Sequence, residues 1–265
     1  MIPPFSLPSN PDQKIYLREA TVSDAIDFAG VDEGHEEEVT TLFLNRLQLP
    51  EHYLDAGKWT ADDRRLALFW YFLHTARDTV APLPYDCRHC GQRHDWLLDL
   101  KALGENYKSI QGKAEREFDF EGEKIIVRPL TGADLEELEM LYLAVDEVGR
   151  KQGKTSGAYK KELARIKLQE ELLVLNFPLD VVTDETERRQ AKEKKVLALT
   201  SSQFAGLVEQ VEAKLTEMEH GLESVYAEGR LYLLTPPHVC PNTKEREVTT
   251  RLRIPFRGID YIPGI

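Results

Sequence analysis

The sequence is poor in cysteine. Its three cysteines, Cys87, Cys90 and Cys240, are too few and odd in number for a framework of disulfide bonds. Disulfide-rich chains belong to oxidising compartments, whereas free thiols are kept in reducing ones. The N-terminal residues also lack the basic segment followed by an apolar one that marks a secretory signal. We therefore place the protein in a cytoplasm, and specifically in a bacterial one.

Long apolar runs and an excess of positive charge are missing as well. The longest apolar run, Leu66 to Leu73, falls far short of the ~20 residues that a membrane helix needs. The formal net charge is −12, whereas a protein that binds a phosphate backbone needs a basic face. With 42% hydrophobic residues, the chain can still bury a sizeable core. We expect neither a membrane nor a nucleic acid as its partner.

The sequence also has no recognisable catalytic motif. Gly153-Lys154-Thr155 looks like the end of a phosphate-binding loop, but the glycine that this motif needs five positions before Gly153 is Val148. There is no Ser-His-Asp ordering and no pair of carboxylates in a plausible cleft order. We expect no enzymatic activity.

The most informative stretch is a cysteine knuckle. Cys87 and Cys90 form a Cys-x-x-Cys turn, followed at once by Gly91 and then by a strand-like stretch that begins at Trp96. Two thiolates at this spacing can bind one tetrahedral metal ion. The remaining cysteine, Cys240, precedes a second strand-like run, and Thr243 stands where its partner cysteine would be. We interpret Cys240 as the remnant of a second knuckle.

Two readings of these cysteines stay open. In one, the chain carries no cofactor and the cysteines are retained in a turn without a metal. In the other, the two knuckles meet in space and bind zinc through Cys87, Cys90, Cys240 and His238, with His94 or His89 as alternative fourth ligands.

A short pattern occurs twice. Four residues recur at a distance of 110 positions, each set at the boundary between a strand and a helix: Ile15, Arg18, Thr21 and Asp24, then Ile125, Arg128, Thr131 and Asp134. In both sets the threonine and aspartate form a helix-capping pair, and a cysteine knuckle follows downstream. We infer an internal duplication.

This pattern predicts an α+β fold that is mostly helical, with two related halves. Each half would run from a strand through a capped helix and further helices to a cysteine knuckle and a β-strand. We expect an extended N-terminal arm, a first half, a second half with the long helices and the degenerate knuckle, and a C-terminal tail, over residues 1–14, 15–104, 105–256 and 257–265.

Among the individual elements, residues 36–47 read as an amphipathic helix, and residues 118–127 as a hairpin that turns at Glu121-Gly122. Residues 204–225 carry apolar side chains at alternating steps of four and three. That spacing predicts one long heptad helix, and self-association of the protein through this helix is one of two arrangements that it allows. The alternative is an ordinary helical hairpin within one chain.

Taken together, the motifs resemble the T4-type bacteriophage baseplate protein family. The resemblance lies in the helix start Arg128 to Asp134, the helical middle, the knuckle at Cys240-Pro241 with its strand to Phe256, and the knuckle at Cys87 and Cys90. It implies a structural part of the baseplate hub in a contractile phage tail. The protein would be made in the bacterial host cytoplasm, would reside in the virion, and would contact other hub, tube or tape-measure proteins.

Two other functions remain open at this point. The chain could be a baseplate or tail assembly chaperone that is absent from the mature virion. It could also be a zinc-binding regulatory protein of the host cell. The resemblance itself implies no catalysis.

Overall fold

The computed structural model describes residues 2–30, 33–178, 184–227, 230–242 and 249–263. The fold is α+β and mostly helical, as predicted, and its β-sheets are small and antiparallel. The chain forms two compact units. Unit 1 comprises residues 1–56, 62–109 and 220–265, and unit 2 comprises residues 57–61 and 110–219. No helix of the described residues is long and apolar enough to cross a membrane.

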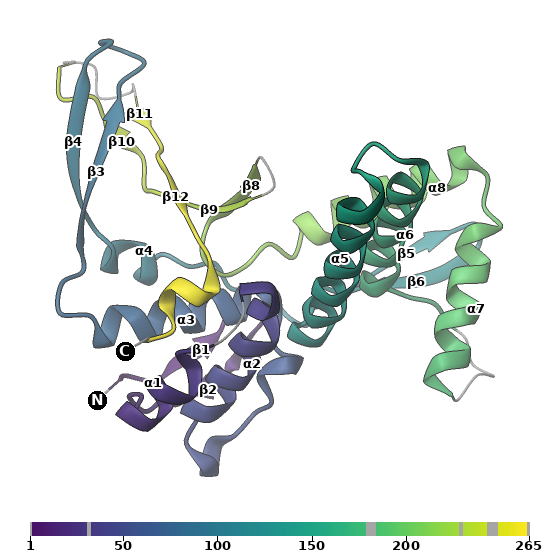
Figure 1. Ribbon diagram of the computed structural model, residues 1–265, viewed down its shortest axis with the longest axis horizontal. Coiled ribbons are helices and arrows are strands. Elements are labelled where there is room, and N and C mark those ends of the chain that lie inside the picture. The colour runs from purple at the N-terminus through teal and green to yellow at the C-terminus, as the bar shows by residue number, and fades with distance from the viewer. Residues whose placement is uncertain (1, 31–32, 179–183, 228–229, 243–248, 264–265) are drawn as a thin grey trace. The chain divides into compact units, whose positions relative to one another are not determined.

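Unit 1 begins with a hairpin and three helices, continues with a long hairpin and a short helix, and ends with the C-terminal strands (Figure 1). Its helices are α1 (Val22–Phe28), α2 (Glu36–Leu47), α3 (Ala61–Thr75) and α4 (Lys101–Glu105). Its strands are β1 (Phe5–Leu7), β2 (Asn10–Ile15), β3 (Val80–Asp86), β4 (Arg93–Asp99), β8 (Ser224–Ala227), β9 (Arg230–Leu234), β10 (His238–Val239), β11 (Thr249–Thr250) and β12 (Arg253–Pro255). Four short 3-10 helices complete the described elements of the chain: η1 (Glu33–His35), η2 (Pro50–His52), η3 (Ala56–Lys58) and η4 (Gly258–Tyr261).

Unit 2 packs four helices with a three-stranded sheet. The helices are α5 (Gly132–Gln152), α6 (Gly157–Val174), α7 (Glu185–Leu197) and α8 (Ser201–Thr216), and the strands are β5 (Arg116–Phe120), β6 (Glu123–Val127) and β7 (Leu175–Asn176). Strand β6 lies between β5 and β7. The predicted turn between β5 and β6 is confirmed: Glu121 and Gly122 both have positive φ, 51° and 81°, as a two-residue hairpin turn requires.

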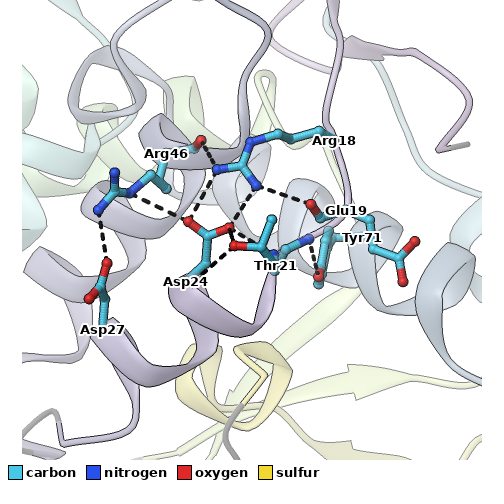
Figure 2. Close-up of polar contacts among 8 residues, drawn as sticks. Arg18, Glu19, Thr21, Asp24, Asp27, Arg46 and Tyr71 are labelled. Atoms are coloured by element: carbon cyan, nitrogen blue, oxygen red, sulfur yellow. Dashed lines mark hydrogen bonds and ion pairs between the residues drawn. The ribbon is translucent and has the colours of Figure 1, made fainter.

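The duplicated pattern builds the same local structure in both units. In unit 1, Arg18 donates to the two carboxylate oxygens of Asp24 at 2.7 and 3.1 Å, and Asp24 also accepts hydrogen bonds from Thr21 (Figure 2). Thr21 in turn caps helix α1 through the backbone N–H of Asp24. A single carboxylate therefore ties the end of the strand to the start of the helix.

The same contacts occur in unit 2. Arg128 donates to both oxygens of Asp134 at 2.6 and 3.1 Å, and Thr131 completes the capping box of α5. The backbone N–H of each arginine also donates to the backbone carbonyl at the end of a helix of the same unit. The distance is 2.9 Å from Arg18 to Leu47, which ends α2, and 3.0 Å from Arg128 to Val174, which ends α6. These equivalent contacts support the inferred duplication.

Two expectations need correction. Residues 1–14 do not form a free extended arm: they contain β1 and most of β2, and Phe5 and Leu7 are buried. The C-terminal tail from residue 257 includes η4, and Tyr261 stacks on Phe256 at a ring-centroid distance of 4.7 Å. The compact units also cut across the predicted halves, because residues 220–265 return to unit 1 and pack there.

The predicted heptad helix is also shorter than expected. Helix α8 ends at Thr216, and Val225 lies in strand β8. After the helix, Gly221 pairs with Lys108 through two backbone hydrogen bonds of 2.9 and 2.8 Å. Phe204, Val211 and Leu215 pack within the hydrophobic core of unit 2, so these seam residues are used inside the chain.

We expect the Asp134→Ala variant to lower the free energy of unfolding by about 1–3 kcal/mol, because it removes a helix cap and leaves Arg128 without its partner. Urea denaturation at neutral pH measures this change. Asp119→Ala, which removes an exposed carboxylate from β5, is the matched control and should be near neutral.

The same carboxylate should make stability depend on pH. Burial raises the pKa of Asp134, but hydrogen bonds from Arg128 and Thr131 outweigh it, so the net pKa is lowered. As the pH falls below about 4, Asp134 becomes protonated in the unfolded chain while it is still ionised in the folded chain. The stabilisation by this carboxylate therefore decreases, and it is lost as the pH approaches the lowered pKa of the folded chain. Asp134→Asn should flatten this acid limb, and an unchanged limb would contradict the assignment.

Candidate metal centre

The long β3–β4 hairpin of unit 1 positions the first knuckle. All seven residues of β3 pair with β4, from Val80 opposite Asp99 to Asp86 opposite Arg93. Side chains alternate between two faces of such a ribbon. One face carries Tyr85 opposite His94, and Leu83 opposite Trp96. The strands thus deliver His94 to the same face as Tyr85, next to the turn.

Backbone hydrogen bonds shape the turn at the end of the hairpin. The N–H of Cys87 donates to the carbonyl of Gln92 at 2.9 Å, and the N–H of Gly91 donates to the carbonyl of Cys87 at 2.9 Å. Gly91 has φ = +68°, a conformation that glycine adopts without strain. This geometry folds Cys90 back toward Cys87.

Cys240 reaches the turn from the C-terminal segment. It follows β10, which pairs with β11 beside the β3–β4 hairpin (Figure 1). The side chain of Asn242 donates to the side-chain oxygen of Gln92 at 2.6 Å. This contact joins residues that are 150 positions apart in the sequence. The two knuckles therefore contribute to one shared site, whereas Thr243 lies outside the described residues.

Three sulfur atoms and one imidazole nitrogen converge at this point. The ligand atoms of Cys87, Cys90, His94 and Cys240 all lie within 4.8 Å of one another, and Cys90 Sγ is 3.0 Å from His94 Nε2. Metal–sulfur bonds of about 2.3 Å in a tetrahedron place neighbouring sulfurs about 3.8 Å apart, so the cluster needs little adjustment. It could hold a metal ion, and no other group of three or more such ligands occurs in the described part of the chain.

The thiols differ in their electrostatic surroundings. Backbone N–H groups of Cys90 and His89 donate to the sulfur of Cys87 and lower its pKa, although burial opposes them. Burial raises the pKa of Cys240. Both side chains are 2% exposed. A cation that enters this site would therefore displace a proton from Cys240, and it would meet two buried ligands, Cys87 and Cys240, and two partly exposed ones, Cys90 and His94.

His238 is not a member of the group of four. Its ring stacks on Trp96 at a centroid distance of 4.2 Å and meets the edge of Tyr85 at 5.6 Å. Burial, together with the nearby His94, lowers the pKa of His238, which suits a neutral ring packed between aromatics. The structure thus brings together the predicted Cys87, Cys90 and Cys240, and it replaces the predicted His238 with His94.

His94 was one of the alternative fourth ligands in the sequence analysis. The alternation of side chains between the two faces of the hairpin could have selected it. Tyr85 lies two residues before Cys87 and pairs with His94, so the side chains of Tyr85 and His94 lie on the same face of the hairpin. The exposed His89 lies within the turn itself and does not belong to the cluster.

Comparison with known proteins leaves this site without a relative. No family model, no curated protein and no solved structure matches the chain.

The assignment of the fourth ligand can be tested with cobalt(II), which gives strong visible absorption when it is bound tetrahedrally by thiolates. We expect His94→Ala to weaken cobalt binding by at least about tenfold, because a ligand is lost. His238→Ala is the matched control, and it should bind cobalt like the native chain. The reverse result for the two histidines would show that the ligand set is wrong.

Proposed function

We propose that this protein is a zinc-stabilised structural protein of a contractile phage tail baseplate, and that it acts through protein–protein contacts without catalysis. The observation that carries the structural role is the donor set. Cys87, Cys90, His94 and Cys240 could together supply the four ligands of one tetrahedral ion, which would leave no position for a water molecule or a substrate. Catalytic zinc sites, in contrast, keep one position open.

The donor atoms favour zinc over other metals. Thiolate and imidazole ligands in a tetrahedral arrangement suit zinc, whereas magnesium and calcium prefer oxygen ligands. A chain with free thiols in a reducing cytoplasm keeps its cysteines available for such a site. When bound, the zinc ion supplies a cross-link and no redox chemistry.

The hydrophobic packing around the site also supports a metal with a structural role. The local core consists of the buried Tyr85, Cys87 and Cys240, with Cys90, Trp96 and Leu252 packed against it. Within the described residues this apolar cluster is small, whereas the ordering of the segments that meet there costs conformational entropy. Metal binding would provide the missing free energy, as it does in other small metal-dependent folds.

The phage baseplate assignment is supported by the resemblance of the motifs. The Arg128–Asp134 helix start and the two knuckles are the shared features, and this chain uses the knuckles jointly. The proposed partners are other hub, tube or tape-measure proteins, and the proposed location is the virion. A net charge of −12 supports protein partners over nucleic acid.

We expect protein that is purified without chelators to contain about one zinc ion per chain. Elemental analysis of the native chain and of Cys240→Ser provides the measurement, because the variant should lose most of the metal. A matched control is Ser224→Ala, which leaves all three cysteines in place. A zinc content below about a tenth of an equivalent in the native chain would reject the metal.

The baseplate assignment predicts that purified particles of the encoding phage contain this chain in a small, fixed copy number. Quantitative mass spectrometry against a tail protein of known copy number tests this prediction. If the chain is present in infected cells but missing from particles, it is an assembly chaperone instead. Stoichiometric zinc in a host protein that is unconnected with particles would favour the regulatory alternative.

A further inference from the structure

The β3–β4 hairpin has a second face, opposite the metal centre. Three of the cross-strand pairs on this outer face are Val80 with Asp99, Pro82 with Leu97 and Pro84 with Asp95. A fourth pair, Asp86 with Arg93, lies closest to the knuckle, and all eight side chains of the outer face are exposed.

The centre of the outer face is apolar. Leu97 is 69% exposed and lies directly across from the exposed Pro82, while Val80 is 47% exposed at one end and Pro84 continues the row at the other. A single exposed apolar residue needs no explanation, whereas a group of exposed apolar residues side by side is a feature of protein interaction sites. The inner face already packs around the metal ligands, so the hairpin does not need the outer residues for its own core.

The prolines indicate how a partner would approach. Proline has no N–H group, so Pro82 and Pro84 interrupt the row of donors that a pairing strand would need along β3. Edge prolines of this kind protect a sheet against the addition of another strand. A partner would therefore contact the flat outer face and not extend the sheet from β3.

The charges indicate what the partner is. Three aspartates, Asp86, Asp95 and Asp99, surround the apolar centre, and Arg93 is the one basic side chain on this face. Like charges would repel a second copy of the chain, whose net charge is −12. The same repulsion disfavours an anionic membrane surface. A protein surface with an apolar centre and a lysine- or arginine-rich rim is complementary.

We propose that the outer face of the β3–β4 hairpin is the docking surface for such a basic-rimmed apolar protein surface. The proposal rests on the proposed function, because it identifies one of the contacts through which a structural protein would act. The candidate metal centre lies beside the inner face of the same two strands. Metal binding and partner binding are thus supported by opposite faces of one hairpin.

Site-specific photo-cross-linking in cells that assemble the particle tests the proposal. Leu97 is replaced by the photoreactive p-benzoyl-phenylalanine, and Leu42 on α2, an apolar residue with 53% exposure, is the matched control position. We expect position 97 to link to one protein through an apolar segment that lysine or arginine flanks, and position 42 not to link to that segment. Mass spectrometry of the cross-linked peptides identifies the segment.

Charge reversal provides the second arm. Asp95→Lys should lower the cross-link yield at position 97 by at least about threefold, because the new lysine would repel the basic rim of the partner. Asp12→Lys, which reverses an exposed aspartate on strand β2, should leave the yield unchanged. The zinc content of each variant must equal that of the native chain, so that a lower yield does not reflect an unfolded hairpin.

Several results would overturn the docking surface. They are the absence of a cross-link at position 97, a link to a second copy or to another part of the same chain, a link to an acidic segment, and equal yields for Asp95→Lys and the native chain. The baseplate role is judged separately, by the presence of the native chain in particles. A cross-link to a basic partner, together with absence of the native chain from particles, would leave the docking surface intact while rejecting the baseplate role.

Discussion

In each unit of this protein, one aspartate joins the end of a strand to the start of a helix. Asp24 and Asp134 each accept two hydrogen bonds from an arginine and further ones from a threonine, and their helices begin at that threonine. The apolar residue at the start of each pattern, Ile15 or Ile125, is fully buried. Because the carboxylate is satisfied on every side, the direction in which the helix leaves the strand is determined locally.

The two units differ in which residues complete their packing. Unit 2 closes its own core around β6, α8 and the end of α6. Unit 1 is completed by residues that are distant in sequence, because its long hairpin meets the C-terminal strands at the cluster of cysteines. The apolar cluster described at that meeting point consists of Tyr85, Cys87 and Cys240 with a few partly buried neighbours, and the same cysteines belong to the group that could hold a metal ion.

The proposed function connects these features. A zinc cross-link would stabilise the hairpin from its inner face, which leaves the outer face free to contact a partner. In our proposal, the aspartates of the outer face favour a basic protein surface, and the edge prolines disfavour the addition of a strand to β3. Other tail proteins are candidates of this kind, and the motifs that resemble the baseplate family led us to propose that setting.

The sequence alone was sufficient for features that depend on neighbours along the chain. The helix at residues 36–47, the turn at Glu121-Gly122 and the capping pairs at Thr21 and Thr131 were predicted at their observed positions. Each of these is set by local periodicity, by backbone preference or by a hydrogen bond over three residues. The three cysteines of the cluster could also be named, because thiols are rare in this chain and their spacing is characteristic of metal ligands.

Tertiary structure decided the rest. The choice of His94 over His238 depends on the register of β3 with β4, and on the path that carries His238 onto Trp96. Helix α8 ends at Thr216 although the apolar period continues beyond it, and Gly221 pairs with the distant Lys108. The return of residues 220–265 to unit 1 depends on contacts between remote segments. Such contacts are set by packing and long-range hydrogen bonds, which leave no periodic signal in the sequence.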